Sequence, residues 1–272
     1  MVSVTLECSC SESDLLVAEC YGLGTAGITE EALPEGRRRL IVYFDSEETA
    51  AEATALLRRS GLTTEPAPER DWTEDSRAVW RPLMIGNRLF LAPPWDATPV
   101  PPGRIRIEMP TGLAFGTGLH ATTQLALEAT EALLKPGASV LDLGTGSGIL
   151  AVTAALLGAG RAVGCDIDTG ALLPAREFAD SFAPGVMLFA GSARSVRSAA
   201  FDLVASNINA VTIVSLAAEV ARVLKPGGRA AVTGFRPRRA ERVRDALATS
   251  GLKVARSLEK DGWTCLIATR VE

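Results

Sequence analysis

The sequence predicts an α/β protein with a doubly wound, mostly parallel β-sheet, preceded by a small α+β unit. The first observation is that short apolar runs alternate with helix-length segments from about Arg104 onward, as in parallel strands covered by helices. The second is a shorter alternation of strand and helix patterns over the first sixty residues. A chain of 272 residues is long enough for two such domains.

The N-terminal unit is expected to have the order β-α-(β)-β-α. Apolar side chains at every second position favour a strand over residues 2–7, and helical spacing favours a helix over residues 11–21. A second strand is expected at 39–44, after which Asp45 has the spacing of a capping-box residue that begins a helix ending near residue 60. This order is typical of a small sheet with helices on one face.

A proline-rich connecting region is expected over residues 61–103. It contains a short helix-like stretch with Trp72 and Trp80 and an apolar run at 89–92. Because aromatic residues seldom occur in solvated spacers, the pattern favours an ordered connector over a flexible linker.

The strands of the doubly wound sheet are expected where short apolar runs lie between helix-length segments. A helix over 212–224 should end at Lys225-Pro-Gly-Gly, because proline ends a helix and glycine turns the chain. The predicted strands are residues 139–143, 161–165, 186–189, 201–205 and 229–233.

Composition and charge exclude several classes of protein. With 47% hydrophobic and 22% charged residues, the chain has the balance of a globular protein, and it shows no membrane span or signal peptide, so we expect a cytoplasmic location. The net charge of −4 does not favour nucleic acid as a substrate. Residues 1–60 carry eleven acidic and five basic side chains, which suits a basic partner, although a solvated acidic surface is the commoner explanation.

A glycine-rich turn, Gly144-Thr145-Gly146-Ser147-Gly148, follows the first strand of the predicted sheet. Open parallel sheets bind ligands beyond the carboxyl ends of their strands, where glycine lets backbone N–H groups approach. The dinucleotide pattern needs a third glycine at position 149, which is Ile, and the loop has no lysine for a phosphate. The remaining pattern, Gly-x-Gly-x-Gly after an Asp-bearing strand, is that of the class I methyltransferases, which use S-adenosylmethionine.

Three polar residues near strand ends are candidates to hold the methyl donor or the acceptor. Asp166 ends the second strand, where its carboxylate can accept hydrogen bonds from two ribose hydroxyls, unless it is an ordinary surface-turn residue. Asp142 either supports the glycine loop or meets the amino end of the donor. Asn207 lies just past the fourth strand, where its side-chain oxygen can accept a hydrogen bond from a target amine and orient its lone pair.

The segment 112–123 is rich in glycine and contains Phe115 and His120, the single histidine of the chain. It is either a glycine-loosened loop before a helix, with Thr122 or Thr123 as N-cap, or a lid that closes over a ligand and excludes water. A lone histidine is more often structural than catalytic, and His120 is the candidate if a general base is needed.

Together these motifs resemble the PrmA family, which methylates large-subunit ribosomal protein eleven. The resemblance implies a ferredoxin-like domain at 1–60 that recognises the ribosomal protein, a connector at 61–103, and a Rossmann-like catalytic domain at 104–272. Lysine side chains and an α-amine are the acceptors in this family. The resemblance rests on residues 115–123, the glycine loop, 164–168 and 207–210, with further similarity at 80–83, 88–95 and 263–265.

The resemblance also implies S-adenosylmethionine as donor and S-adenosylhomocysteine as product. Five cysteines without the paired spacing of zinc ligands give no support to a metal site. Asn207 and His120 are the catalytic candidates. The residues expected to contact the donor are Phe115, Thr123, Asp142, Gly144, Thr145, Gly146, Gly148, Asp166, Ile167 and Asn207.

Two departures from the family's motifs concern the acceptor. Leu119-His120-Ala121 stands where the family has Thr-His-Pro, and Asn209 replaces an apolar residue. We expect direct methyl transfer to a neutral amine of a basic protein, such as a large-subunit ribosomal protein. The alternatives are another protein lysine or a small molecule as acceptor, and a donor-binding protein without turnover. A further alternative, a nicotinamide oxidoreductase, is disfavoured by Ile149. A basic stretch at 236–244 is more typical of a solvated helix face than of an RNA contact.

Overall fold

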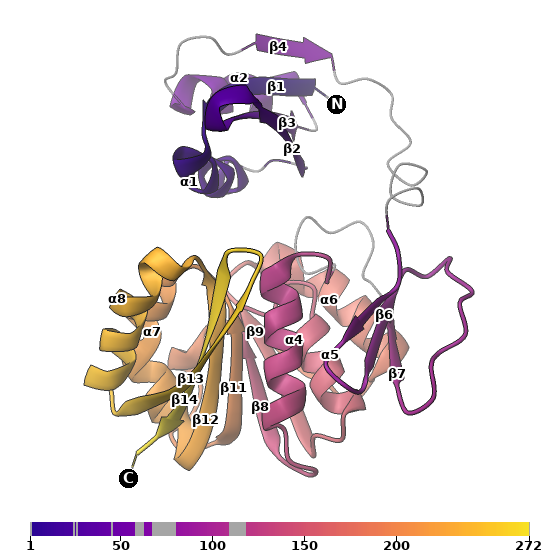
Figure 1. The fold of residues 1–272 in the computed structure, drawn as a ribbon, viewed down its shortest axis with the longest axis vertical. Coiled ribbons are helices and arrows are strands. Elements are labelled where there is room, and N and C mark those ends of the chain that lie inside the picture. The colour runs from indigo at the N-terminus through magenta and orange to yellow at the C-terminus, as the bar shows by residue number, and fades with distance from the viewer. Residues whose placement is uncertain are drawn as a thin grey trace. The chain divides into compact units, whose positions relative to one another are not determined.

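The computed structural model describes residues 2–23, 25, 27–44, 46–57, 63–66, 80–108 and 118–271. The chain forms two compact units, Met1–Val79 and Trp80–Glu272, each of which is described here by itself (Figure 1). The functional limits expected at residues 60 and 103 stay a proposal. Among the described helices, none combines the length and the apolar character that crossing a bilayer requires.

The N-terminal unit is an antiparallel sheet of four strands in the order β2-β3-β1-β4. In the succession β-α-β-β-α-β, each helix joins two strands that have a third strand between them, which is the ferredoxin-like arrangement. Its elements are β1 Val2–Ser9, α1 Cys10–Gly22, β2 Gly27–Leu33, β3 Arg37–Phe44, α2 Glu47–Leu57 and β4 Thr63–Pro66, with a 3-10 turn at Pro34–Gly36.

One face of this small sheet carries the core of the N-terminal unit. Alternate side chains of β1 and β3, such as Val4 and Val42, are fully buried. They pack against Leu16 of α1 and Ala50 of α2. The period of two in the sequence therefore marks the face that the helices cover.

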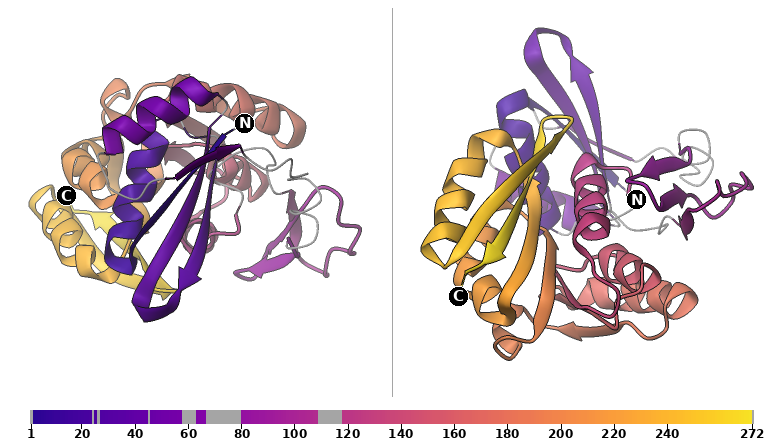
Figure 2. Two further views of the ribbon diagram at one scale, coloured as in Figure 1. Left: turned by 90° about the horizontal axis from the view of Figure 1, so that it is seen from above. Right: turned by 60° about the horizontal axis from the view of Figure 1, so that its bottom comes forward.

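The C-terminal unit is built on a seven-stranded sheet in the order β10-β9-β8-β11-β12-β14-β13. The strands from β10 to β12 run parallel, and β14 runs antiparallel to both of its neighbours (Figure 2). The strand order reverses between β8 and β11, which is where open α/β sheets bind ligands. The strands are β8 Ser139–Leu143, β9 Arg161–Asp166, β10 Met187–Ala190, β11 Phe201–Asn207, β12 Leu224–Phe235, β13 Leu252–Lys260 and β14 Trp263–Arg270.

Helices cover both faces of this sheet, which confirms the doubly wound class. Side chains alternate along the central strand β8, so that Val140 packs into the core formed with α4 and α5 and Leu141 into the core formed with α7 and α8. The helices are α4 Ala121–Leu133, α5 Ile149–Leu156, α6 Thr169–Phe182, α7 Ala210–Val223 and α8 Pro237–Thr249, with a 3-10 turn at Ala193–Ser195.

A three-stranded sheet precedes α4 and is fastened to it. The Glu131 carboxylate of α4 accepts hydrogen bonds from the backbone amides of Asn87 and Arg88, which join β5 to β6. The Arg104 guanidinium donates to three backbone carbonyls of the same hairpin. The region is therefore held in place against the larger sheet. Its strands are β5 Leu83–Ile85, β6 Leu89–Ala92 and β7 Ile105–Glu108, in the order β5-β6-β7.

Several local expectations are corrected or lie outside the described residues. The apolar run at 89–92 is confirmed as β6, but Trp80 lies in no helix and instead stacks on Trp95 with ring centroids 5.7 Å apart. Trp72 and Asp45 lie outside the described residues. At the start of α2, the Ser46 hydroxyl oxygen accepts a hydrogen bond from the Thr49 amide.

The predicted strands of the large sheet are confirmed to within two residues, except at β12. This strand begins at Leu224, because Leu224 pairs with Phe201 before an irregular stretch that contains Lys225-Pro-Gly-Gly. The antiparallel hairpin β13–β14 was not predicted. Most side chains of β13 are exposed, so the strand lacks the apolar run by which its parallel neighbours are recognised.

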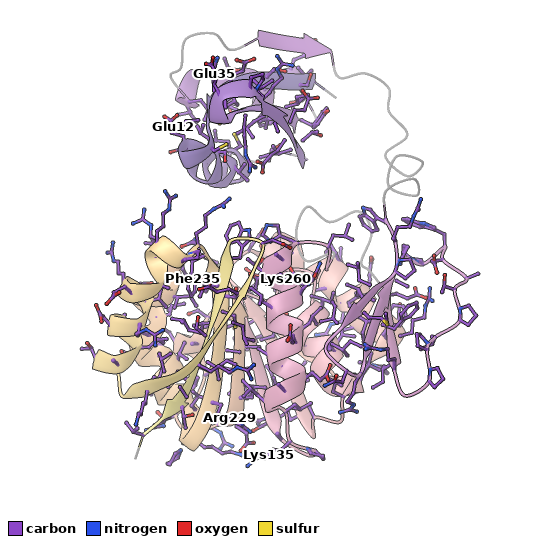
Figure 3. The ribbon with its side chains drawn as sticks, in the orientation of Figure 1. Glu12, Glu35, Lys135, Arg229, Phe235 and Lys260 are labelled. Atoms are coloured by element: carbon purple, nitrogen blue, oxygen red, sulfur yellow. The ribbon has the colours of Figure 1, made fainter. Side chains whose placement is uncertain are left out.

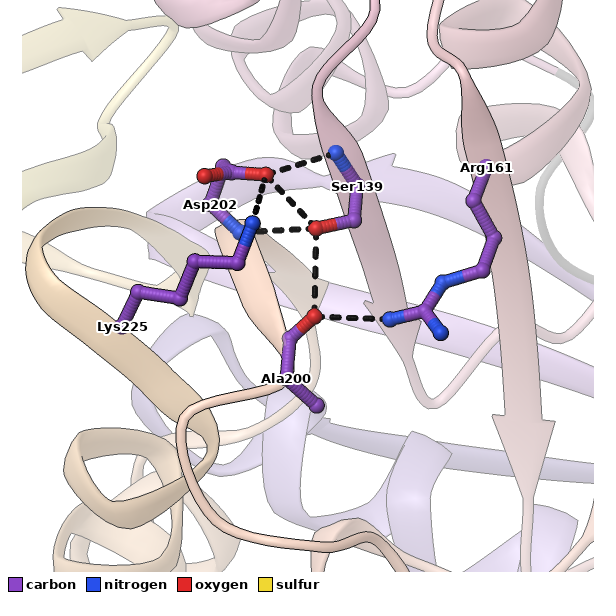
Figure 4. Close-up of polar contacts among 5 residues, drawn as sticks. All are labelled: Ser139, Arg161, Ala200, Asp202 and Lys225. Carbon is purple, nitrogen blue, oxygen red and sulfur yellow. Dashed lines mark hydrogen bonds and ion pairs between the residues drawn. The ribbon is translucent and has the colours of Figure 1, made fainter.

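The amino ends of the central strands are tied together by a polar cluster (Figure 4). Asp202 of β11 accepts hydrogen bonds from the amide and hydroxyl of Ser139 and from the ammonium of Lys225. Partial burial acts to raise the pKa of Asp202, but the hydrogen bonds from Lys225 and Ser139 outweigh it and lower the pKa to about 2. Arg161 of β9 donates to the Ala200 carbonyl beside this cluster.

Candidate functional site

The glycine-rich loop after β8 adopts backbone conformations that favour glycine. Gly144, Gly146 and Gly148 have φ angles of 76°, 49° and 81°, in the left-handed region. A Cβ atom on Gly144 would clash with Cγ2 of Ile208. A Cβ atom on Gly146 would meet no atom of the described residues within 4 Å. The loop is therefore packed at its start and open at its middle.

Asp142, which is fully buried in β8, supports this loop from the sheet. Its Oδ2 accepts hydrogen bonds from the Thr145 hydroxyl at 2.7 Å and from the Ala151 amide at 3.1 Å. Its buried Oδ1 has no hydrogen-bond partner among the described residues. Burial, opposed by the two hydrogen bonds, raises the pKa of Asp142 to about 7. One carboxylate oxygen thus holds the loop, and the other would be stabilised by a hydrogen-bond donor.

Asp166 ends β9 beside the loop. Its Oδ2 accepts a hydrogen bond from the Gly146 amide at 2.9 Å, and its Oδ1 accepts one from the Asp168 amide at 3.0 Å. Each carboxylate oxygen has a second lone pair, so the group can also accept hydrogen bonds from a ligand. The next side chain, Ile167, is 80% exposed and offers an apolar surface. A hydrogen-bond acceptor and an apolar surface are therefore neighbours in the chain at this edge.

Asn207 ends β11, on the other side of β8. Its side-chain amide donates a hydrogen bond to the hydroxyl of Thr123 in α4 at 3.2 Å. With the NH2 group directed to Thr123, the side-chain oxygen is the atom that can accept from a ligand. Asn209 has a local role, because its Oδ1 caps α7 by accepting from the Thr212 amide at 2.9 Å. Capping of α7 thus accounts for the polar residue at position 209 without a contact to the acceptor.

The described part of the expected lid begins at Gly118. Residues 109–117, and with them Phe115, lie outside the described residues. Gly118 has a φ of 91°, and a Cβ atom there would clash with Leu91 and approach Ile149 to 3.4 Å. The segment that leads into α4 is therefore packed between β6 and the helix that follows the glycine loop.

His120 is the N-cap of α4. Its Nδ1 accepts a hydrogen bond from the Thr122 amide at 3.3 Å and lies 2.7 Å from the Thr122 hydroxyl oxygen. The prediction that Thr122 or Thr123 caps this helix is wrong, since both are buried within its first turn. An imidazole here takes the place of the usual hydroxyl or carboxylate acceptor.

The ring of His120 also lies against Trp263, the first residue of β14. The ring centroids are 4.8 Å apart and the planes are inclined at 72°. Arg236, which follows β12, has its guanidinium carbon 4.8 Å from the centre of the same Trp263 ring. Sequence reasoning named these residues without joining them to the site. No signal in the sequence joined them, because Trp263 reaches this edge only through the β13–β14 hairpin.

Gly234 is a further residue that sequence reasoning missed. It has a φ of 101°, and a Cβ atom there would clash with the backbone of Ile208. The end of β12 therefore comes close to the residue that follows Asn207. A glycine inside a strand pattern often marks such a close approach of two backbones, and this was the signal to use.

The described candidates converge at one edge of the sheet. The glycine loop follows β8, while Asp166 and Asn207 end the two strands that flank it. Thr123 and His120 reach this edge from the first turn of α4. The arrangement combines a backbone turn with open space, a carboxylate and an oriented amide, which suits a nucleoside ligand and a second group beside it.

Comparisons with known proteins agree with this geometry. The family model described as "Ribosomal protein L11 methyltransferase (PrmA)" matches residues 9–271. A ribosomal protein L11 methyltransferase of Symbiobacterium thermophilum is 39% identical over 202 residues, which are 74% of this chain and 66% of that protein. One of Cupriavidus necator is 36% identical over 255 residues, covering 91% of this chain and 83% of the relative.

Among solved structures, the chain is similar to a ribosomal protein L11 methylase from Lactobacillus delbrueckii subsp. bulgaricus. The two are 29% identical, with a TM-score of 0.63 over 71% of this chain and 99% of the other.

Proposed function

The chain belongs to the PrmA family of ribosomal protein L11 methyltransferases, and from this premise we propose that it methylates lysine or N-terminal amines of ribosomal protein L11. It is an S-adenosylmethionine-dependent protein methyltransferase. The observation that carries the proposal is the meeting of the glycine loop, Asp166 and Asn207 at the point where the strand order reverses.

The described residues fit S-adenosylmethionine. The open space at Gly146 suits the close approach of a nucleoside to the loop. The second lone pairs of the Asp166 carboxylate suit the ribose hydroxyls, and the exposed Ile167 side chain suits the adenine. The unpaired Oδ1 of Asp142 suits a cationic amino group. Gly144, Thr145, Gly148 and Thr123 complete the proposed set within the described residues, and Phe115 belongs to it by resemblance. Bound there, S-adenosylmethionine supplies a methyl group activated by a positively charged sulfur.

On the acceptor side, we propose that Asn207 orients the amine. Thr123 accepts the hydrogen bond of the Asn207 NH2 group, which turns the amide oxygen toward the acceptor position. That oxygen accepts an N–H from the neutral amine and so aligns its lone pair for in-line attack on the methyl carbon. The amine must first lose its proton, and desolvation favours its neutral form. If the amine needs a proton acceptor, His120 is the candidate that the sequence names, and a positioning role for the same residue is argued below.

We propose that the N-terminal unit recognises the protein substrate. The charge of residues 1–60 suits a basic partner such as a ribosomal protein. Removing residues 1–79 should abolish methylation of the protein while donor binding persists. Equal methylation of the protein by the shortened enzyme would show that the N-terminal unit does not recognise the substrate.

The main experiment incubates the full chain with labelled S-adenosylmethionine and purified large-subunit ribosomal proteins, followed by mass spectrometry of the labelled band. We expect the label on ribosomal protein L11 at lysine or N-terminal amines. Label on another protein would show that the proposed acceptor is wrong. Donor binding measured by calorimetry, without label on any protein, would favour a binding protein without turnover. Asn207→Ala serves as the control that should bind the donor and fail to transfer.

A further inference from the structure

We propose that His120 is a positioning residue that acts in its neutral form, with the proton on Nε2. Through Nδ1 it caps α4 and so holds Thr123 against Asn207, and protonation of the ring releases this cap. The proposal rests on the proposed function for its effect on turnover, but the tautomer and the cap are properties of the free protein.

The backbone decides which ring nitrogen carries the proton. The Thr122 amide can only donate, so Nδ1, at 3.3 Å from it, must be the acceptor. The Thr122 hydroxyl, 2.7 Å from the same nitrogen, then donates as well. A neutral imidazole that accepts at Nδ1 has its proton on Nε2. A doubly protonated ring cannot accept from the Thr122 amide and so loses the cap, and its Nδ1–H can then only donate to the Thr122 hydroxyl oxygen.

The entry to α4 is a fixed segment that transmits this state. The side chain of Gln124 donates to the Leu119 carbonyl at 2.8 Å, just before the cap. Gly118 is packed against Leu91 and Ile149. A loosened cap therefore acts on the first turn of the helix, where Thr123 meets Asn207 across 84 positions of sequence.

The described surroundings of the ring include positive charge. The amino end of α4 carries a partial positive charge from the backbone. The Trp263 ring, which His120 contacts, is also in contact with the guanidinium of Arg236. Lys260 pairs with Trp263 in the β13–β14 hairpin, and the acidic groups near this turn are Glu259 and Asp261, both exposed. Figure 3 labels Phe235 and Lys260 at this edge of the C-terminal unit.

The sign of the pH effect follows from these contacts. Above its titration midpoint the ring is neutral, α4 is capped and Asn207 is held. As the pH falls through the midpoint, the ring becomes an imidazolium at the positive end of a helix, which expels it from the cap. A general base would lose turnover over the same pH range, so the pH profile of the wild type cannot alone tell the two roles apart.

The single histidine makes the first test direct. In protein labelled with ¹⁵N-histidine, the two ring nitrogen signals report the tautomer and the titration of His120 without assignment. We expect Nε2–H at pH 8. In a second sample labelled uniformly with ¹⁵N, the side-chain amide signals of Asn207, identified by their loss in Asn207→Gln, should change over the same pH range. An Nδ1–H tautomer, or Asn207 signals that do not follow the titration, would overturn the proposal.

Two substitutions separate the cap from a proton acceptor. We expect His120→Ala to lose about tenfold in turnover, because the first turn of α4 is misplaced. Asparagine caps helices well and does not titrate in this range, so His120→Asn should keep much of the turnover that His120→Ala loses. The acid limb of the pH profile should weaken in His120→Asn. Equal loss in both variants would make His120 the base and overturn the proposal.

The two proposals fail in different ways. If the wild type transfers no methyl group to any amine, the proposed function is wrong. The tautomer, its titration and the coupled Asn207 signals still decide whether His120 caps α4 and holds Asn207.

Discussion

The side-chain amide of Asn207 lies 3.2 Å from the hydroxyl of Thr123, although the two residues belong to different elements of the C-terminal unit. Asn207 ends a strand beside the glycine loop, and Thr123 is buried in the first turn of α4. The contact makes the orientation of the Asn207 amide, the proposed catalytic group, depend on a helix that precedes the whole parallel sheet in sequence.

Replacing Thr123 with valine should slow methyl transfer more than it weakens donor binding. Valine keeps the shape of threonine but cannot accept the Asn207 hydrogen bond, so the amide is free to turn. We expect kcat to fall about tenfold, since one neutral hydrogen bond contributes about 1 kcal/mol. Thr130→Val is the matched control, because Thr130 lies in the same helix and, among the described residues, its hydroxyl donates to the Ala126 carbonyl alone. Steady-state kinetics that show equal losses would contradict the prediction.

Asn207→Ala should abolish most of the turnover and leave donor binding nearly intact. Its amide oxygen is proposed to orient the acceptor, whereas the donor is held by the loop and by Asp166. We expect kcat to fall on the order of a hundredfold, the scale of a lost orienting group. Calorimetry of donor binding and single-turnover transfer measure the two effects. A parallel loss of donor affinity would show that Asn207 holds the donor instead.

Asp166→Ala should weaken donor binding by about tenfold to a hundredfold, as expected for lost hydrogen bonds to a charged group. The substitution removes both the proposed ribose contact and the carboxylate that fixes the Gly146 amide. Asp168→Ala is the control: it removes the cap of α6, where Asp168 accepts from the Gly170 amide, and should cost about 1 kcal/mol of stability. Similar donor affinities for the two variants would reject a special role for Asp166.

The stability of the protein should decline between about pH 4 and pH 7 because of Asp142. Burial raises the pKa of Asp142 to about 7 from 3.8, so the folded state binds the proton more tightly than the unfolded state. The resulting cost is absent below pH 4, grows as the pH rises and is complete above pH 7. By linkage it amounts to a few kcal/mol at most.

The comparison for this prediction is Asp142→Asn. The amide keeps an oxygen for the Thr145 and Ala151 contacts and has no charge to desolvate. Chemical unfolding at pH 5 and pH 8 should therefore show a larger loss for the wild type. A wild type whose stability rises over this range as much as that of the variant would mean that Asp142 is not desolvated.

The strand pattern and the glycine spacing were sufficient to predict the doubly wound sheet and the place of Asp166 and Asn207. Parallel strands are buried on both faces, so their apolar runs stand out locally in the sequence. The β13–β14 hairpin has no such run, because β13 is largely exposed, and it was missed.

Contacts between distant segments could not be predicted in the same way. That His120 caps α4 depends on a side chain without the usual preference for an N-cap. Its contact with Trp263 depends on the unpredicted hairpin. The proximity of Arg236 follows only once β12 and β14 are known to be neighbours.

The Asp202 cluster lies at the opposite end of the central strands from the glycine loop. Substitutions in this cluster would change the stability of the sheet without altering contacts to the methyl donor or the acceptor. Stability can therefore change at this end of the sheet while the edge that carries the glycine loop, Asp166 and Asn207 keeps its geometry. The length of the strands thus separates the residues that hold the sheet together from those proposed to bind the ligands.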